Sequence, residues 1–320
     1  MAKFIVTGGA GFIGSNVVKA LNDRGETDIL VVDDLNSPLK ERHLSRLKYS
    51  AYLDKRELRP ALKNGQFADA TAIFHLGACS STTEKNADYL ADNNTAYTRE
   101  LAEWCLDGGR RFVYASSAST YGAGECGYSD DEAVIPRLKP LNLYGQSKQA
   151  FDLIALKRGW FSHIVGLKFF NVFGPNEDHK GNMRSMIHQA YGQILQSGRI
   201  RLFKSYHPDY PDGGQLRDFV YVKDVVAEIL YFHDNPSKNG IFNCGTGKAR
   251  SWLDLGNAVF RAMDREPNIE FIEMPEQLRA HYQYFTEADM SKARAAGFSH
   301  AFLPLEDAVA DYVRNHLVNE

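Results

Sequence analysis

The stretch Phe4-Ile-Val-Thr-Gly-Gly-Ala-Gly-Phe-Ile-Gly14 decides the fold, because a short apolar run leads directly into three glycines spaced three residues apart. Gly8 permits a tight turn, Gly11 lets backbone N–H groups approach a pyrophosphate, and Gly14 lets the following helix pack close to the strand. The N-terminus of that helix then faces the anion. A second apolar run, Asp28-Ile-Leu-Val-Val-Asp33, ends in an acid about twenty residues further on, where dinucleotide-binding folds hydrogen-bond the adenosine ribose. Although glycine-rich turns are common, this placement predicts dinucleotide binding.

Length and charge narrow the class of protein. A chain of 320 residues is long enough for one elaborated domain or two. The net charge of -3 provides no general attraction to nucleic acid or to an anionic membrane. No run approaches the roughly 18 uninterrupted apolar residues of a membrane span, and glycines interrupt the N-terminal apolar stretch too often for a secretion signal. We therefore expect a cytoplasmic protein with no nucleic-acid or membrane partner.

The cysteines do not indicate a metal centre or a disulfide framework. Cys79, Cys105, Cys126 and Cys244 are widely separated, and no two of them form a Cys-x-x-Cys pair. The expectation is four reduced thiols and no bound metal.

Apolar runs alternate with amphipathic helices through the first half of the chain. The runs lie at Phe4–Thr7, Ile29–Asp33, 72–76, 111–116 and 164–170. This alternation predicts an α/β fold with a doubly wound, mainly parallel sheet of the Rossmann type. Ligands bind outside the carboxyl ends of such strands, so the residues that follow these runs should line one crevice.

The alternation of apolar runs and amphipathic helices becomes less regular after residue 170. Residues 175–215 are rich in Gly, Pro, Asn and His, with one short helix near 185–196, and strand-like runs return at 218–222 and 240–246. We therefore predict two interleaved domains. Residues 1–170 and 216–248 would form the dinucleotide-binding domain, and 171–215 and 249–320 a smaller, mixed α/β substrate domain.

A second group of residues, Tyr144-Gly-Gln-Ser-Lys148 with Ser117 at the end of an apolar run, suggests the chemistry. Side chains four residues apart share one face of a helix, so the Lys148 ammonium can stand beside the Tyr144 phenol and lower its pKa from about 10 toward neutrality. Such a tyrosine can take a proton from a substrate hydroxyl while a hydride leaves for a nicotinamide. One Tyr-x-x-x-Lys among 16 tyrosines can arise by chance, but its combination with the glycine motif favours an active site.

At these residues the chain resembles the extended short-chain dehydrogenase/reductase family, whose marks are Thr-Gly-Gly-x-Gly-x-x-Gly and Tyr-x-x-x-Lys. Within that family it is most similar to the nucleotide-sugar epimerases that act on an ADP-linked heptose. The stretches that carry this resemblance are Phe74-His-Leu-Gly-Ala-Cys-Ser-Ser-Thr-Thr-Glu84, Asp92-Asn-Asn94, Tyr114-Ala-Ser-Ser117, Phe170-Asn-Val-Phe-Gly-Pro175, His179-Lys-Gly-Asn-Met183 and Arg217-Asp-Phe-Val-Tyr221.

The resemblance implies two acid/base residues, Tyr144 and Lys180, on opposite faces of the substrate, with Ser117 and Lys148 in support. It implies dinucleotide contacts from the glycine loop and the strand ends, namely Gly8, Gly11, Phe12, Ile13, Gly14, Asp33, Asp34, Lys40, Lys55, Leu76, Gly77, Ala78, Cys79, Ser80, Asn93, Lys148, Val172 and Lys180. The nucleotide-sugar pocket would be lined by Ser117, Asn171, Asn182, Gln189, Phe203, Lys204, Ser205, Tyr206, Arg217 and Tyr282.

The implied reaction is epimerisation at C6 of the heptose by transient oxidation and re-reduction, a step in making the lipopolysaccharide core precursor. The residues near the expected ribose site give conflicting indications of whether the cofactor is NAD or NADP. Asp33 and Asp34 favour the free ribose hydroxyl of NAD, whereas Lys40 and Lys55 can neutralise a 2′-phosphate. The resemblance points to NADP, with NAD as the weaker candidate, and to a homo-oligomer, specifically a homopentamer.

Several alternatives stay open from the sequence. A nucleotide-sugar 4-epimerase would use the same tyrosine and lysine, a 4,6-dehydratase would need an acid pair where Ala118-Ser119 stand, and a non-catalytic dinucleotide sensor would not need Tyr144. In a simpler interpretation, Lys180 is a surface lysine and Arg217 is a partner in a structural ion pair. The chain also departs from the family at Gln189, where a histidine is frequent, and in the longer 206–214 insertion, which would reshape the pocket.

Overall fold

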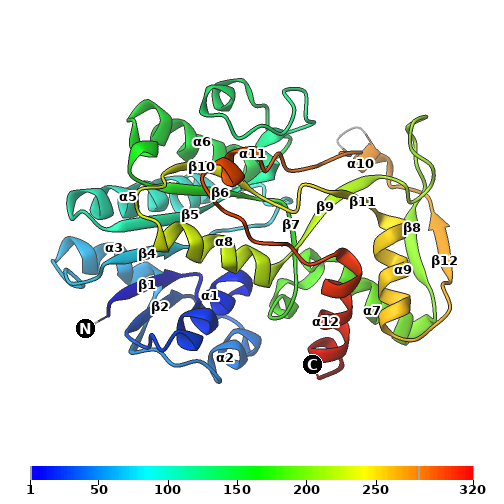
Figure 1. Cartoon of the computed structure of the whole chain (residues 1–320), viewed down its shortest axis with the longest axis horizontal. Coiled ribbons are helices and arrows are strands. Elements are labelled where there is room, and N and C mark those ends of the chain that lie inside the picture. Colours follow the sequence, from blue (N-terminus) through cyan, green and yellow to red (C-terminus); the bar gives the residue numbers. More distant parts are fainter. Residues whose placement is uncertain (1, 280–281, 320) are drawn as a thin grey trace.

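A parallel sheet of seven strands forms the centre of the molecule, in the order β10-β6-β5-β4-β1-β2-β3 (Figure 1). The computed structural model describes residues 2–279 and 282–319. The strands of this sheet are β1 (Phe4–Thr7), β2 (Ile29–Asp33), β3 (Ala51–Asp54), β4 (Ala72–His75), β5 (Arg111–Ser117), β6 (Val165–Phe169) and β10 (Gly240–Cys244). Each neighbouring pair is parallel, which confirms the predicted doubly wound fold.

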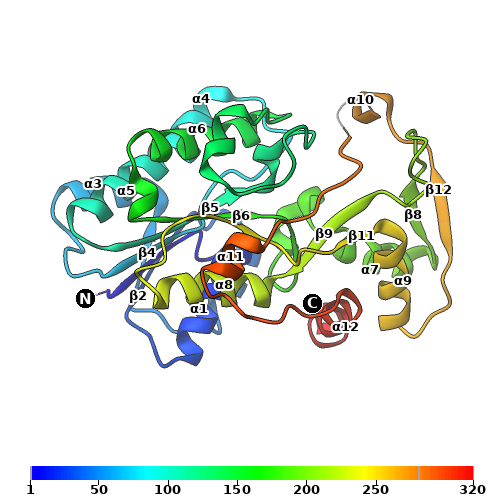
Figure 2. The ribbon, with the colours of Figure 1, turned by 45° about the horizontal axis from the view of Figure 1, so that its top comes forward.

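Helices cover both faces of this sheet. They are α1 (Phe12–Asp23), α2 (Pro38–Leu44), α3 (Lys55–Lys63), α4 (Ala87–Leu90), α5 (Tyr97–Asp107), α6 (Leu143–Lys157) and α8 (Val222–Asp234). Figure 2 shows α3, α5 and α6 on one side of the sheet and α1 and α8 on the other. The side chains of β1 alternate accordingly, since Phe4 and Val6 belong to the core on the α1 side and Ile5 to the core on the α3 side. A strand buried on both faces has no face turned to solvent, so most of its side chains are apolar, which explains the continuous apolar runs.

The smaller part of the molecule contains two short sheets. One has the order β11-β9-β7, and the other pairs β12 with β8. Their strands are β7 (Asn171–Phe173), β8 (Ile200–Phe203), β9 (Leu216–Tyr221), β11 (Ala249–Ser251) and β12 (Ile269–Ile272), and the helices around them are α7 (Met186–Ser197), α9 (Trp252–Ala262), α10 (Glu276–Arg279), α11 (Ser291–Ala295) and α12 (Leu305–Asn315). The β7–β9 and β8–β12 pairs are parallel and β9–β11 is antiparallel, so this part is mixed.

Two local features differ from the sequence analysis. Strand β9, grouped there with the dinucleotide-binding part, pairs only with strands of the smaller sheet among the described residues, although α8 directly after it packs on the central sheet. Strand β3 was missed because it lies at the sheet edge with half-buried and exposed side chains, so it has no apolar run. The exact domain boundaries remain a prediction.

Within the described ranges, no helix is both long enough and apolar enough to cross a membrane.

Candidate active site

A cavity of about 1000 Å³ lies at the carboxyl ends of β1, β2, β4, β5 and β6. Its wall includes every residue that the sequence analysis assigned to dinucleotide contacts, together with Ser117 and Tyr144. Parallel strands end at one edge of a sheet, so residues far apart in the sequence meet there. The contacts themselves remain a prediction, but the residues share one surface.

The glycine turn is built so that two of its glycines cannot carry a side chain. Gly8 has a φ of +67°, and a Cβ added there would lie 2.6 Å from the backbone nitrogen of Gly77. A Cβ on Gly14 would lie 2.0 Å from the Gly8 carbonyl oxygen, so the first turn of α1 rests directly on the loop. At Gly11 the nearest atom would be 3.2 Å away, and this residue lines the cavity. The turn therefore presents bare backbone to the cavity, as a pyrophosphate site requires.

Two acids and two lysines form the end of the cavity beyond β2. Asp33 is buried, and its Oδ2 accepts a hydrogen bond from the backbone N–H of Ala10 at 2.9 Å. Its Oδ1 lies 2.9 Å from Lys40 Nζ, while Lys55 Nζ lies 3.5 Å from Asp34 Oδ2. Each carboxylate thus faces an ammonium group. The glycine turn and Lys40 each contact one oxygen of Asp33, and the same side chain lines the cavity.

Tyr144 and Lys148 lie in the first turns of α6, which Asn142 caps by accepting a hydrogen bond from the Gly145 N–H at 2.8 Å. Lys148 is buried and its Nζ donates to the Ala115 carbonyl at 2.8 Å. Burial raises the pKa of Tyr144, and a hydrogen bond with Ser117 opposes that shift. The expected fall in the pKa of Tyr144 is therefore not found among the protein's own groups, because burial outweighs the Ser117 hydrogen bond. Burial also lowers the pKa of Lys148 itself to about 8.

A buried network behind the tyrosine holds α6 against the sheet. The Asp152 carboxylate accepts hydrogen bonds from the Tyr114 hydroxyl at 2.7 Å, Ser116 Oγ at 2.8 Å and Lys168 Nζ at 2.9 Å. Asp152 and Lys168 are almost completely buried. Removing one partner of such a pair leaves an uncompensated buried charge, so the network keeps α6 in one register relative to Ser117.

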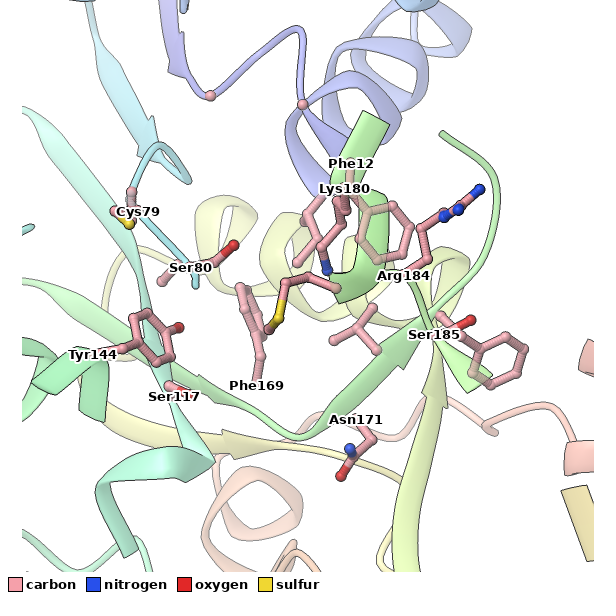
Figure 3. Close-up of a pocket in the computed structure, with 18 of the residues that line it drawn as sticks. Phe12, Cys79, Ser80, Ser117, Tyr144, Phe169, Asn171, Lys180, Arg184 and Ser185 are labelled. Atoms are coloured by element: carbon pink, nitrogen blue, oxygen red, sulfur yellow. The ribbon is translucent and has the colours of Figure 1, made fainter. Parts of the chain in front are cut away.

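Lys180 enters the cavity from another side. It lies in a short helical loop, η5 (Asp178–Met183), which turns at Gly181 with a φ of +55°. Its ammonium is 5.2 Å from the ring centroid of Phe12, and burial lowers its pKa. Figure 3 shows the Lys180 ammonium and the Tyr144 hydroxyl pointing into the same cavity from different directions (Figure 3). Lys180 is therefore not a surface lysine.

The residues assigned to the nucleotide sugar divide into two groups. Ser117, Asn171, Gln189, Phe203 and Tyr282 line the cavity. Asn182, Lys204, Ser205, Tyr206 and Arg217 are not part of its wall.

Tyr206 and its neighbours point elsewhere. Lys204 forms an exposed ion pair with Glu273 at 2.6 Å, and the Tyr206 ring stacks under the Arg279 guanidinium at 3.8 Å. Asp212, inside the predicted insertion, accepts a hydrogen bond from the Ser205 N–H at 2.7 Å. The insertion therefore folds back on the 204–206 segment.

Arg217 lies one layer behind the cavity wall. It is 7% exposed and donates to the Leu216 carbonyl at 2.8 Å and to the carbonyl of Gln283. Its guanidinium lies 5.2 Å from the ring centroid of Tyr282 and 5.7 Å from that of Trp252. No ion pair to it exists among residues 2–279 and 282–319, so the structural ion-pair reading is wrong, and burial lowers its pKa.

Sequence reasoning missed the far end of the cavity. Its lining there includes Gln193, Arg201, Trp252, Leu255 and Ile272, which come from α7, β8, α9 and β12. Trp252 begins α9 after a Ser251–Asp254 capping box, which signals a helix start but no function. No local pattern marked these residues, because their shared position results from packing between distant segments.

The fold, the glycine turn and the Tyr144–Lys148 pair define a dinucleotide-dependent enzyme. The chain belongs to the NAD dependent epimerase/dehydratase family, whose model matches residues 4–245. It is 56% identical over 315 residues to an ADP-L-glycero-D-manno-heptose-6-epimerase of Nitratidesulfovibrio vulgaris, covering 98% of each chain. A protein of the same name from Fusobacterium nucleatum is 48% identical over 326 residues, covering 99% of this chain and 98% of the relative.

A solved structure shows the same fold. The crystal structure of the ADP-L-glycero-D-manno-heptose-6-epimerase of Helicobacter pylori matches with a TM-score of 0.81 and 26% identity, covering 98% of this chain and 96% of that one.

Proposed function

We propose that the protein interconverts ADP-D-glycero-D-manno-heptose and ADP-L-glycero-D-manno-heptose by inverting C6, in the synthesis of the lipopolysaccharide core precursor. The observation that carries this proposal is that Tyr144 and Lys180 approach one cavity from two directions. Inverting a secondary alcohol requires proton transfer on both faces of the carbon, and a second acid/base group meets that need. The 56% identical relative supports the same substrate.

The cavity residues suit a nicotinamide dinucleotide. The glycine turn leaves bare backbone where a phosphate approaches, and the lysines at the β2 end offer positive charge. A nicotinamide dinucleotide held by these residues would supply reversible hydride transfer at C6, with no net consumption of cofactor.

Residues of the chain itself donate and accept the proton at the C6 oxygen. The raised pKa of Tyr144 keeps its phenol protonated at neutral pH, so this residue is ready to donate a proton to a C6 oxygen. Burial lowers the pKa of Lys180, so a larger fraction of its amine is unprotonated and able to accept a proton than in an exposed lysine. Ser117 lies beside Tyr144 and can orient the same oxygen. The two groups exchange roles when the reaction runs in reverse.

We expect purified protein incubated with either ADP-heptose epimer to yield a mixture of both, because the redox cycle is closed. Chromatographic separation of the epimers measures conversion, and absorbance of reduced nicotinamide should stay flat. UDP-glucose serves as the contrast substrate. Steady accumulation of reduced nicotinamide, or conversion of UDP-glucose without conversion of ADP-heptose, would overturn the proposal.

NADP is the proposed cofactor because Lys40 and Lys55 offer positive charge beside Asp33 and Asp34, which supports neutralisation of a 2′-phosphate. We expect Lys40→Ala to weaken NADP binding by roughly tenfold to a hundredfold, the usual contribution of a hydrogen bond to a charged group, while NAD affinity changes less. Calorimetric titration with both dinucleotides measures this. Lys19→Ala, which removes an exposed lysine paired with Asp23 on α1, is the control and should leave both affinities unchanged. Equal losses for NAD and NADP would contradict a phosphate contact.

We also propose that the protein acts in the cytoplasm as a homo-oligomer, specifically a homopentamer. The resemblance supports the subunit count, and a nucleotide-sugar substrate supports the compartment.

A further inference from the structure

The loop that carries Lys180 is tied to the cofactor side of the molecule by a buried ion pair. His43, on α2, lies with its Nε2 2.6 Å from Asp178 Oδ1. Its Nδ1 lies 2.9 Å from the carbonyl oxygen of Ala10, in the glycine turn. The side chains are 2% and 8% exposed. His43 therefore bridges the glycine turn and the residue two positions before Lys180.

The His43 ring contacts the glycine turn and Asp178 through different nitrogens, each at hydrogen-bond distance. Burial alone would raise the pKa of the Asp178 carboxyl, but the hydrogen bond and charge of His43, together with Arg42, lower it to about 2. The carboxylate is therefore ionised at neutral pH, and the contact is a charge-assisted hydrogen bond, stronger than a neutral one.

The charge of His43 also acts on His179. Burial and then the positive charges of His43 and Lys40 lower the pKa of His179 to about 4, with Asp178 acting the other way and Lys180 adding to the decrease. The two imidazole rings lie 5.2 Å apart, nearly perpendicular. The neighbourhood of Asp178 is thus dominated by positive charge.

Asp178 lies at the start of the loop that carries Lys180. Its Oδ1 also accepts the backbone N–H of His179 at 3.0 Å, at the start of η5. Glu177, the residue before the loop, is completely buried, and its Oε1 accepts a hydrogen bond from Ser185 Oγ at 2.6 Å. This contact connects the two ends of the loop. Its attachment to α1 is by neutral hydrogen bonds, such as Asn176 Nδ2 to Ser15 Oγ at 2.9 Å, whereas its attachment to α2 is the charged pair.

The same three side chains, His43, Asp178 and His179, have ligand atoms within 4.8 Å of one another, as a metal site would. Two observations favour the ion pair. The 2.6 Å separation of His43 Nε2 and Asp178 Oδ1 is a hydrogen-bond distance, and the Arg42 guanidinium already binds the other carboxylate oxygen. A divalent cation would meet positive charge on several sides.

We propose that His43 and Asp178 are positioning residues that hold Lys180 over the cofactor, so that the glycine turn and the second acid/base group form one assembly. This inference rests on the proposed function of Lys180. It links two sites far apart in the sequence: the turn that receives the dinucleotide and the loop that supplies the proton-transfer group.

The test compares Asp178→Asn and His43→Gln with wild type. We expect kcat for ADP-heptose to fall about tenfold to a hundredfold, since a misplacement of about 1 Å can cost a hundredfold, while KM changes less than twofold. In a Lys180→Ala background, Asp178→Asn should cause no further loss. Acetylation of Lys180 by an N-hydroxysuccinimide ester, followed by mass spectrometry, should become several-fold faster in both variants because the loop is released.

Asp224→Asn is the matched control. Asp224 forms a similar pair with His300 Nε2 at 2.7 Å, on α8, away from the Lys180 loop. Its substitution should leave kcat and the Lys180 acetylation rate unchanged. Thermal unfolding identifies any variant that fails to fold. If Asp178→Asn does not fold, His43→Gln alone provides the test.

Unchanged kcat and acetylation rate in both variants would overturn the proposal, as would an equal loss of turnover in the Lys180→Ala background. Addition of Zn²⁺ or EDTA should have no effect, and a zinc-dependent gain of activity would replace the ion pair with a metal site. If the wild-type protein does not convert ADP-heptose, the proposed function fails, but the acetylation rates still decide whether the ion pair holds the loop.

Discussion

Replacing Tyr144 with phenylalanine, or Lys180 with alanine, is expected to lower turnover of ADP-heptose by about a hundredfold or more, the usual contribution of a positioned acid/base group. Both side chains face the cavity and neither supports the core, so both variants should fold. The measurement is the rate of epimer conversion in each direction, with circular dichroism and cofactor affinity as checks on folding. Leu153→Ala, at a partly exposed position of α6, is the control and should keep full turnover.

The two losses should differ between the epimers, because each epimer needs a different residue as its first base. The double variant should keep little beyond ligand binding. If Lys180→Ala leaves both directions intact while Tyr144→Phe abolishes them, the single-tyrosine scheme of a 4-epimerase is the better account, and Lys180 becomes a cofactor contact.

Gly14→Ala is expected to destabilise the protein by about 3 kcal/mol, the upper end for overpacking, and to weaken cofactor binding by tenfold or more. Its Cβ would lie 2.0 Å from the Gly8 carbonyl oxygen, so either α1 or the glycine turn must move. Chemical denaturation measures the free energy of unfolding, and calorimetric titration measures the affinity for NADP.

Gly192→Ala on α7 is the matched control, because no heavy atom lies within 4 Å of the Cβ position there. Alanine in a helix is favoured over glycine by up to about 1 kcal/mol, so this variant should be equally or more stable. Native stability and full NADP affinity in Gly14→Ala would show that the helix does not rest on the turn as described.

The sequence alone determined the features that depend on neighbouring residues. The central strands are buried on both faces, so their apolar runs appear directly in the sequence, as in Ile29–Asp33. The spacing from Gly8 to Gly14 follows from a turn that leaves no room for side chains. Tyr144 and Lys148 share a helix face because they are four residues apart. These features depend on backbone geometry over a few residues, which local sequence specifies.

Only the tertiary structure decided how the remaining residues meet. Arg217 stands behind Tyr282 and Trp252, Tyr206 packs against Arg279 and is not part of the cavity wall, and the contact of His43 with Asp178 spans 135 residues of sequence. The pKa of Tyr144 is raised and not lowered as expected, because burial, which no spacing reveals, outweighs the hydrogen bond with Ser117. Contacts of this kind depend on how separate helices and loops pack. The spacing of neighbouring residues carries no information about which distant segments pack together, so a local pattern does not predict these contacts.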